Sequence, residues 1–91
     1  MTYSLVYSKR ADKDLSKLDA PQRKIIVAWM SKNIKDCEDP RVFGKALEAN
    51  HRGKWRYRIG KYRILVKIED DKLIVIALQI GHRKEIYKDK N

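Results

Sequence analysis

The stretch KWRYRIGKYRILVKI, residues 54–68, decides the fold of this chain. Apolar and cationic side chains alternate on both sides of a central Gly-Lys pair, which is the pattern of two antiparallel strands joined by a two-residue turn. In the first strand Trp55, Tyr57 and Ile59 share one face, and the other face carries only Lys and Arg. The stretch therefore predicts a β-hairpin with an apolar face on the core and a cationic face turned away from it.

The cationic face of this hairpin repels itself. A two-residue turn places Arg58 directly opposite Arg63, with about 5 Å between their Cβ atoms, and like charges at that spacing destabilise a sheet. Seven Lys and Arg residues and no acid lie between Glu48 and Glu69. On an ordinary surface hairpin such side chains splay into water. Here they fill a whole strand face, which favours a surface prepared for phosphate groups.

The N-terminal part of the chain predicts one strand and two helices. Residues 2–8 alternate as a short strand, and Ser8 is placed to cap a helix. Residues 9–18 carry apolar side chains at helical spacing, which indicates an amphipathic helix with a narrow buried stripe. After a break at Asp-Ala-Pro, a second and more apolar helix extends as far as Cys37.

The C-terminal part completes a single domain over residues 1–91. Residues 40–53 show no periodicity and are interpreted as a connecting loop. A continuously apolar strand over residues 73–80 follows the hairpin, and a short polar segment ends the chain. The predicted fold is α+β, with two N-terminal helices packed on a mostly antiparallel four-stranded sheet in the order strand, helix, helix and three strands.

Charge is the most informative part of the composition. Among 91 residues, 22 Lys and Arg stand against 12 Asp and Glu, a formal net charge of +10. So large an excess on a small domain favours a polyanionic partner, either nucleic acid or an acidic protein. No apolar run reaches the length of a membrane span, and the first residues do not resemble a signal peptide. We therefore expect a cytoplasmic protein with no membrane partner.

Histidine and cysteine do not suggest a metal site or a cofactor. The single cysteine, Cys37, cannot form an internal disulfide, and its spacing from Met30 and Ile34 is typical of a buried helical residue. The two histidines, His51 and His82, do not form a ligand set with it. We expect neither a bound metal nor a cofactor.

Two motifs carry a resemblance to a known family. WRYRIGxYR at 55–63 is followed by GHRxxxY at 81–87. Both lie within GKALEANHRGKWRYRIGKYRILVKIEDDKLIVIALQIGHRKEIY, residues 44–87, which resembles the second to fourth strands and the C-terminal segment of RelE-type toxins of bacterial toxin–antitoxin pairs, in the RelE/ParE superfamily. The preceding strand and helices agree with that family, so the resemblance covers nearly the whole chain and implies a RelE-like fold.

The resemblance implies a ribosome-dependent, metal-independent mRNA endonuclease that cuts messages in the ribosomal decoding site. In this family the RNA 2′-hydroxyl attacks the adjacent phosphodiester, which leaves a 2′,3′-cyclic phosphate and a free 5′-hydroxyl. The partners implied are mRNA, ribosomal RNA and an acidic cognate antitoxin that holds the toxin inactive. By motif position, the catalytic set implied is Arg56, Arg58, Arg63, Arg83 and Tyr87.

The chemistry of these residues agrees with part of that assignment. The forked guanidiniums of Arg58 and Arg63 match phosphate oxygens, Arg83 is placed to act near the leaving 5′-oxygen, and Tyr87 can stack on a base. Further substrate contacts are expected from Arg52, Lys54 and Lys61.

The general base is open on the sequence alone. The best-known family members carry lysine at the positions of Arg56 and Arg58, and arginine holds its proton far more firmly than lysine. One answer is that Arg56 acts electrostatically while water or the ribosome takes the proton. The alternative bases are Lys54, His82 and Glu85.

Two other functions compete with this interpretation. Superfamily members of the ParE type poison gyrase, and they tend to lack the arginine and tyrosine set. A non-catalytic nucleic-acid-binding module would use the hairpin as a phosphate track and Trp55 or Tyr57 as stacking platforms. The alternation disfavours the second, because it places both rings on the apolar face.

Overall fold

The computed structural model describes residues 1–47 and 53–84 of the chain. They form, in order, β1 (Ser4–Tyr7), α1 (Lys9–Ser16), α2 (Ala20–Asn33), β2 (Lys45–Ala46), β3 (Trp55–Ile59), β4 (Tyr62–Glu69) and β5 (Ile74–His82). Three residues of the predicted site, Arg52, Glu85 and Tyr87, lie outside the described residues. Within the described ranges, no helix is long and apolar enough to cross a membrane.

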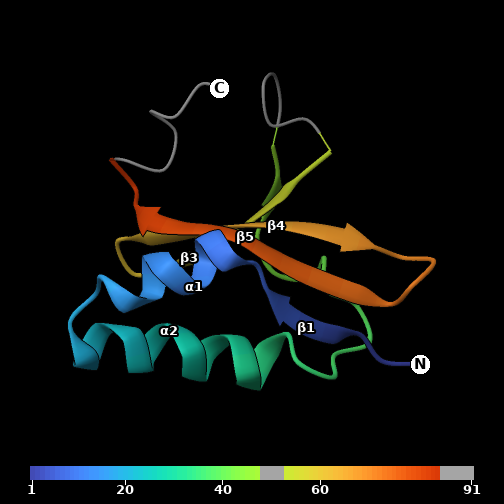
Figure 1. The fold of residues 1–91 in the computed structure, drawn as a ribbon. Coiled ribbons are helices and arrows are strands. Elements are labelled where there is room, and N and C mark those ends of the chain that lie inside the picture. Colours follow the sequence, from blue (N-terminus) through green and yellow to red (C-terminus); the bar gives the residue numbers. More distant parts are fainter. Residues whose placement is uncertain (48–52, 85–91) are drawn as a thin grey trace.

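The strands form one sheet in the spatial order β1-β5-β4-β3-β2, and both helices cover the same face of it (Figure 1). β1 runs parallel to β5, whereas the other neighbouring pairs are antiparallel. The predicted α+β class is therefore confirmed. The predicted count of four strands is wrong, because Lys45 and Ala46 pair with Arg56 and Trp55 inside the segment interpreted as a loop. Two residues are too few to show a strand periodicity.

The core lies between the two helices and the sheet. Each of its residues is less than 10% exposed. The helices and the turn after α2 supply Ala11, Leu15, Ile26, Met30 and Ile34, and β3, β4 and β5 supply Tyr57, Ile59, Ile64, Val66, Val75, Ala77 and Ile80. The prediction that the apolar face of the hairpin fixes it to the core is confirmed, with Trp55 packed half-buried at the margin.

β3 and β4 pair in the register that the two-residue turn predicts. Ile59 lies opposite Tyr62, and Arg58 lies opposite Arg63. Gly60 in the turn has φ +60°, a conformation that such hairpin turns require and that a side chain disfavours. The two arginines are therefore cross-strand neighbours.

α2 ends earlier than the sequence predicts. It stops at Asn33, and the chain reverses at Asp36, which has a left-handed φ of +62°. The Asp36 N–H then donates to the Tyr3 carbonyl, and the Tyr3 N–H donates to the Cys37 carbonyl, each at 2.9 Å. The expectation of a helical Cys37 is wrong, because pairing with the start of the chain ends the helix first. Cys37 is half-buried beside the core instead.

β5 contains one more residue than the part of β4 that it faces. The pairing shifts between Leu65 and Val66, which leaves Leu78 as the extra residue of a β-bulge. The bulge changes the phase of the alternation, so that Ala77 before it and Ile80 after it both face the core. Without the bulge, two residues three apart in a strand would lie on opposite faces.

α1 and its N-cap residue hold this bulge. Asp14 Oδ2 accepts the Ile80 N–H at 2.9 Å, and the Ser8 hydroxyl donates to the Leu78 carbonyl at 3.1 Å. The same Ser8 oxygen accepts the Ala11 N–H at 3.0 Å, which confirms it as the cap of α1. One hydroxyl therefore caps the start of the helix and fixes it to the β-bulge of the sheet.

Asp14→Ala removes the acceptor of the part-buried Ile80 N–H and leaves that donor without its protein partner. We expect the free energy of unfolding to fall by about 1–3 kcal/mol and the Ile80 amide to exchange faster with solvent deuterium. Asp12→Ala, at an exposed acid on the same helix, should leave that amide as protected as in the wild type. Equal exchange rates in the two variants would contradict the anchor.

A second anchor joins the start of the chain, the segment after α2 and the β4–β5 turn. Asp70 Oδ1 accepts the Tyr3 hydroxyl at 2.7 Å, and Arg41 donates from its two Nη atoms to Oδ1 and Oδ2 at 2.9 and 3.1 Å. The hydrogen bonds from Arg41 and Tyr3 lower the pKa of Asp70 below its ordinary value of 3.8. The ionised carboxylate therefore stabilises the fold.

Asp70→Asn keeps the shape of this side chain and removes its charge. Because the pKa of Asp70 is lower in the folded chain, its contribution to stability is present above the ordinary value of 3.8 and is lost as the pH falls through the folded-state value. In urea unfolding, we expect the variant to be less stable than wild type near neutral pH and the gap to close in acid. Asp71→Asn is the charge-matched control. A gap that is unchanged in acid would refute the prediction.

Candidate nucleic-acid interface

The sheet face turned away from the helices carries a row of positive side chains. Arg56 and Arg58 alternate with the core residues of β3, Arg63 and Lys67 do so on β4, and Lys45 of β2 pairs with Arg56. We call these five residues the cationic face. Because the helices cover only the opposite side of the sheet (Figure 1), neither helix packs on it. The predicted division of the hairpin into an apolar and a cationic face is confirmed.

Arg63 is the enclosed member of the cationic face. It is 7% exposed, whereas Arg58 directly opposite is exposed to solvent. Nη1 of Arg63 lies 3.4 Å from the Gly60 carbonyl oxygen and 3.3 Å from that of Tyr62, and donates to both. Buried arginines are normally held by partners of this kind. The guanidinium is therefore fixed against the hairpin turn.

The acid on β4 lies at the far end of the strand from Arg63. Glu69 is 3.7 Å from the Lys67 ammonium and 3.5 Å from the Lys72 ammonium. Its charge is therefore shared by two lysines at that end. At the turn end, the facing Arg58 and Arg63 concentrate positive charge, and a phosphate between them would relieve their repulsion.

Two more cations meet this pair at the hairpin turn. Lys61 is exposed in the turn, and its carbonyl accepts the N–H of the exposed Arg83 at 2.8 Å. Gly81 pairs with Arg63, so β5 adds no side chain at that position. The structure thus brings Arg58, Lys61, Arg63 and Arg83 together at one corner of the sheet.

The other described basic candidates lie further along β3. Arg56 is half-buried, two residues before Arg58. Lys54 precedes the strand and lines a hollow of about 220 Å³ with Arg41 and Trp55. The structure therefore places Lys54 towards the opposite end of the hairpin from the corner where the arginines meet.

His82 lies at the end of β5, beside a ring rather than beside the arginines. It pairs with Tyr62, and the two rings meet edge to face with centroids 5.8 Å apart. Its Nδ1 accepts the Lys84 N–H at 3.1 Å. Sequence reasoning missed this contact because it depends on the bulge at Leu78, which decides the phase of the last residues of β5.

Gly44 positions Arg56, and sequence reasoning missed it as well. Its φ is +81°, and a Cβ at this position would lie 2.0 Å from the Arg56 carbonyl oxygen. The neighbouring backbone is tied to the same strand, because the Trp55 indole N–H donates to the Phe43 carbonyl. The only sequence signal is a glycine in a segment without periodicity. Close approach of the Gly44 backbone is what allows β2 to pair with β3.

Tyr57 secures this segment from the core side. It is fully buried, its hydroxyl donates to the Pro40 carbonyl at 2.6 Å, and its ring lies 5.5 Å from that of Trp29. Burial raises the pKa of Tyr57 above its ordinary value of 10.0, so the hydroxyl remains a donor at neutral pH. A ring enclosed in this way is not a stacking platform for nucleic-acid bases.

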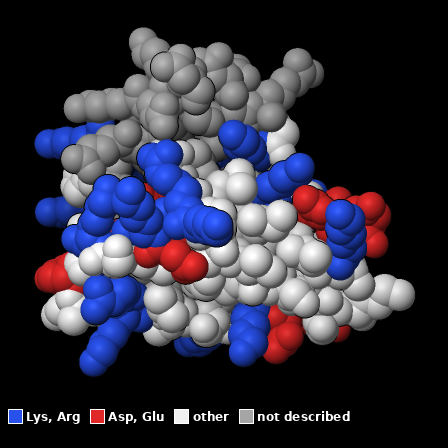
Figure 2. All heavy atoms as spheres, in the orientation of Figure 1, with Lys and Arg blue, Asp and Glu red and all other residues white. Residues whose placement is uncertain are grey.

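Positive charge also gathers on the side of the molecule that carries α1. Figure 2 shows Lys and Arg spheres gathered left of centre, over α1, with acidic spheres at the lower edge of the group. Lys9, Arg10 and Lys13 are exposed on this helix, and Lys17 follows its last turn. Within residues 1–47 and 53–84, no group of three or more His, Cys, Asp or Glu side chains is arranged to hold a metal ion.

Comparison with known sequences finds toxins. Residues 5–87 match the family model of the ParE toxin of the type II toxin–antitoxin system parDE. The chain is 34% identical over 89 residues to Toxin RelG of Mycobacterium tuberculosis (strain ATCC 25618 / H37Rv), an alignment that covers 97% of this chain and 99% of the relative.

Comparison with solved structures finds the same fold. The toxin–antitoxin complex RelBE2 of Mycobacterium tuberculosis contains a chain that matches with a TM-score of 0.83 and 27% identity, over 93% of this chain and 95% of that one. A mutant of the Escherichia coli toxin RelE in the free state matches with a TM-score of 0.74 and 22% identity, over 99% and 95% of the two chains. The second similarity is one of fold alone.

Gly44→Ala adds a methyl group where the backbone of Arg56 lies. Gly60→Ala is the matched control, since Gly60 also has a positive φ but nothing lies within 4 Å of its added Cβ. Both variants bear the conformational cost, and only the first also disrupts the β2–β3 pairing. We expect Gly44→Ala to lose about 1–3 kcal/mol more of the free energy of unfolding than Gly60→Ala. Equal losses in urea unfolding would show that the contact is unimportant.

Proposed function

The chain belongs to the RelE/ParE family of type II toxins, and from this premise we propose that it is a ribosome-dependent mRNA endonuclease. The observation that supports this most strongly is the corner formed by Arg58, Lys61, Arg63 and Arg83. Two facing guanidiniums with two further cations beside them suit a phosphodiester whose negative charge increases during the reaction.

In the proposed reaction the 2′-hydroxyl of the RNA attacks the neighbouring phosphorus. The bond from phosphorus to O2′ forms and the bond to O5′ breaks, giving a 2′,3′-cyclic phosphate and a 5′-hydroxyl. Arg63, fixed by its contacts with the turn, and the exposed Arg58 bind the non-bridging oxygens. Arg83 stabilises the negative charge that develops on the leaving O5′, which takes a proton from water to become the 5′-hydroxyl. Tyr87 is assigned to stacking on a base.

Proton removal from the 2′-hydroxyl is assigned to a group outside the corner. Arginine does not release its proton at neutral pH, Lys54 lies towards the other end of the hairpin, and His82 packs on Tyr62. Arg56 lowers the energy of the developing alkoxide by its charge, and water or the ribosome takes the proton. A positioning-dominated reaction of this kind depends on the ribosome to orient the message.

The proposed regulator is an acidic cognate antitoxin that covers the cationic face. The net charge of +10 favours an acidic protein partner, and the similar chain of RelBE2 comes from a toxin–antitoxin complex. Such a partner removes the phosphate contacts by occupying them. Action on ribosomes places the protein in the cytoplasm.

A gyrase poison is the second candidate, because the matching family model is named for ParE. The two activities leave different products. A gyrase poison causes DNA breaks with mRNA intact, whereas the proposed activity cuts mRNA only where ribosomes are present. The cationic corner favours the RNA reaction, since three of its four cations, Arg58, Arg63 and Arg83, occupy positions that the RelE motif uses.

The test is translation of a defined message in a reconstituted system, with the 5′ ends of the RNA mapped. We expect cleavage by the wild type with ribosomes and none without them. Arg58→Ala and Arg83→Ala should each lower the cleavage rate about 100-fold, the typical loss on removing one group that stabilises developing charge. Tyr87→Ala should also slow cleavage.

Lys72→Ala is the matched control, because it removes an exposed cation at the far end of the β4–β5 hairpin. It should cleave as the wild type does. Equal cleavage by the wild type and all variants would refute the assignment of Arg58, Arg83 and Tyr87 to the active site. Absence of cleavage in the presence of ribosomes would refute the proposed function. DNA breaks with intact mRNA would support a gyrase poison instead.

A further inference from the structure

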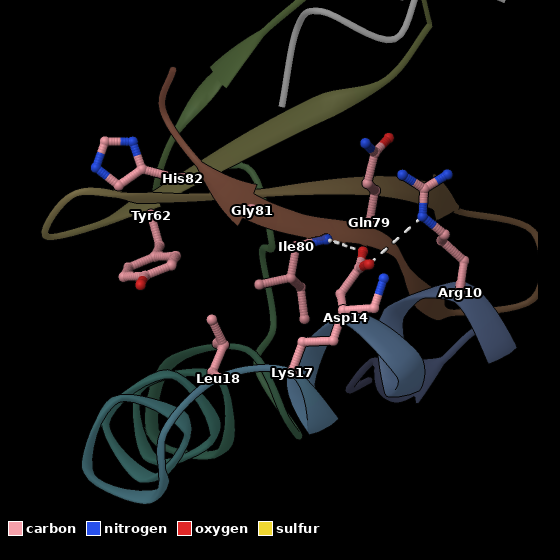
Figure 3. A pocket seen from close by; sticks show the side chains of 9 residues that line it. All are labelled: Arg10, Asp14, Lys17, Leu18, Tyr62, Gln79, Ile80, Gly81 and His82. Carbon is pink, nitrogen blue, oxygen red and sulfur yellow. Dashed lines mark hydrogen bonds and ion pairs between the residues drawn. The ribbon is translucent and has the colours of Figure 1, made fainter. Parts of the chain in front are cut away.

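A cleft of about 350 Å³ opens between α1 and the ends of β4 and β5, on a different side from the cationic face (Figure 3). The proposed reaction does not use it. Its lining combines cations, rings and an amide, chiefly Arg10, Lys17, Leu18, Tyr62, Gln79 and His82. We call it the α1–β5 cleft. Its volume lies within the range of about 300–1,000 Å³ that small-ligand sites occupy.

The cations stand at the two ends of α1. Arg10 is in the first turn and Lys17 is the C-cap, seven residues later, so both lie on the same side of the helix about 10 Å apart along its axis. Asp14 lies between them but is already engaged, because Oδ2 accepts the Ile80 N–H and Oδ1 is 3.5 Å from Arg10 Nε. Its side chain is only 12% exposed. The opening of the cleft is therefore net positive.

The far part of the cleft is aromatic and apolar. Tyr62 and His82 meet edge to face, Ile80 lies beside Tyr62, and Leu18 lies below it (Figure 3). Gln79 extends on the other side of the strand end, towards Arg10, with an amide that can donate and accept hydrogen bonds. Rings beside cations and one amide are the combination by which proteins hold an unstacked base and its phosphate.

We propose that the α1–β5 cleft binds one nucleotide of single-stranded RNA. The base packs against Tyr62 and His82, and its phosphates face Arg10 and Lys17. An acidic peptide is the less suitable occupant, because carboxylates would use the two cations and leave the rings without a role.

The cleft and the cationic corner adjoin at the end of the sheet. Tyr62 precedes Arg63, His82 precedes Arg83, and the pairs Tyr62–His82 and Arg63–Gly81 are consecutive in the register. An RNA strand with its scissile phosphate at the corner therefore reaches the cleft with a neighbouring nucleotide by passing the end of β5. The inference that one RNA strand spans the corner and the cleft rests on the proposed function. The inference that the cleft binds a nucleotide does not depend on it.

The test uses the full chain without ribosomes and a fluorescent six-nucleotide RNA whose 2′-hydroxyls are methylated, so that binding is measured without cleavage. The double variant Arg10→Gln/Lys17→Gln should weaken binding at least about tenfold, because it removes two charge-assisted contacts. It should also lower the slope of log affinity against log salt by about 1.4, or 0.7 for each single-strand phosphate contact.

Lys9→Gln/Lys13→Gln is the matched control. It removes the same charge from the same helix at two lysines that do not line the cleft. Its affinity should fall by less than about threefold. If the two double variants lose affinity equally, net charge explains the binding and the cleft proposal is overturned.

Tyr62→Leu tests the base. It should weaken RNA binding and leave the binding of a hexaglutamate peptide unchanged. Loss of peptide binding in the Arg10→Gln/Lys17→Gln variant, with no effect of Tyr62→Leu on RNA, would instead identify a site for an acidic protein and overturn the RNA proposal. Unfolding midpoints check that each variant folds. If the double variant does not fold, the RNA affinity of Lys17→Gln is compared with that of Lys13→Gln. A larger loss in Lys17→Gln supports the cleft, and an equal loss refutes it.

Failure of this inference and failure of the proposed function give different results. Ribosome-dependent cleavage by the wild type, together with unchanged RNA affinity in the cleft variants, would support the proposed function and refute the cleft as an RNA site. RNA binding that depends on Lys17 and Tyr62, with no cleavage on ribosomes, would support the cleft as an RNA site and refute the proposed function.

Discussion

The hydrogen bond from the Ile80 N–H to the Asp14 carboxylate fixes the point on which both surfaces of this protein depend. It closes the bulge at Leu78, and the bulge sets the phase of the last residues of β5. That phase pairs Gly81 with Arg63 and His82 with Tyr62. A change of one residue in the pairing would exchange the two faces of the strand end. The cationic corner and the α1–β5 cleft would then both be lost.

The cationic face has a cost that the rest of the fold offsets. Arg58 and Arg63 face each other across two strands, and cross-strand like charges destabilise a sheet. The same strands carry Tyr57, Ile64 and Val66 on the other face, each with 0% exposure. Burial of such side chains stabilises by roughly 1.5–3 kcal/mol each, which offsets the repulsion between the exposed Arg58 and the enclosed Arg63. The core therefore keeps two guanidiniums close together before any phosphate binds.

The sequence predicts the parts of this fold that repeat with a regular period. The alternation around Gly60 is sufficient for the hairpin, its register and the facing of Arg58 and Arg63, because each depends on local geometry. The early end of α2 does not follow from periodicity, since pairing of Asp36 and Cys37 with Tyr3 ends the helix. The two-residue strand β2 depends in the same way on the close approach of Gly44 to a distant strand. Long-range backbone contacts of this kind leave almost no local pattern.

The candidate site likewise combines features that follow from local periodicity with features that depend on long-range contacts. The sequence identifies the basic residues of the hairpin, whereas the pairing of Gly81 with Arg63 and the contact of His82 with Tyr62 depend on how β5 is bulged and anchored. This bears on the proposed chemistry, because the arginines assigned to the phosphate lie apart from Lys54 and His82, the described side chains considered as bases. A corner of arginines stabilises charge without supplying a base. If it acts as the proposed nuclease, a toxin of this construction needs something else to orient the RNA and receive the proton. Under the proposed function, dependence on the ribosome follows from which cations occupy the hairpin.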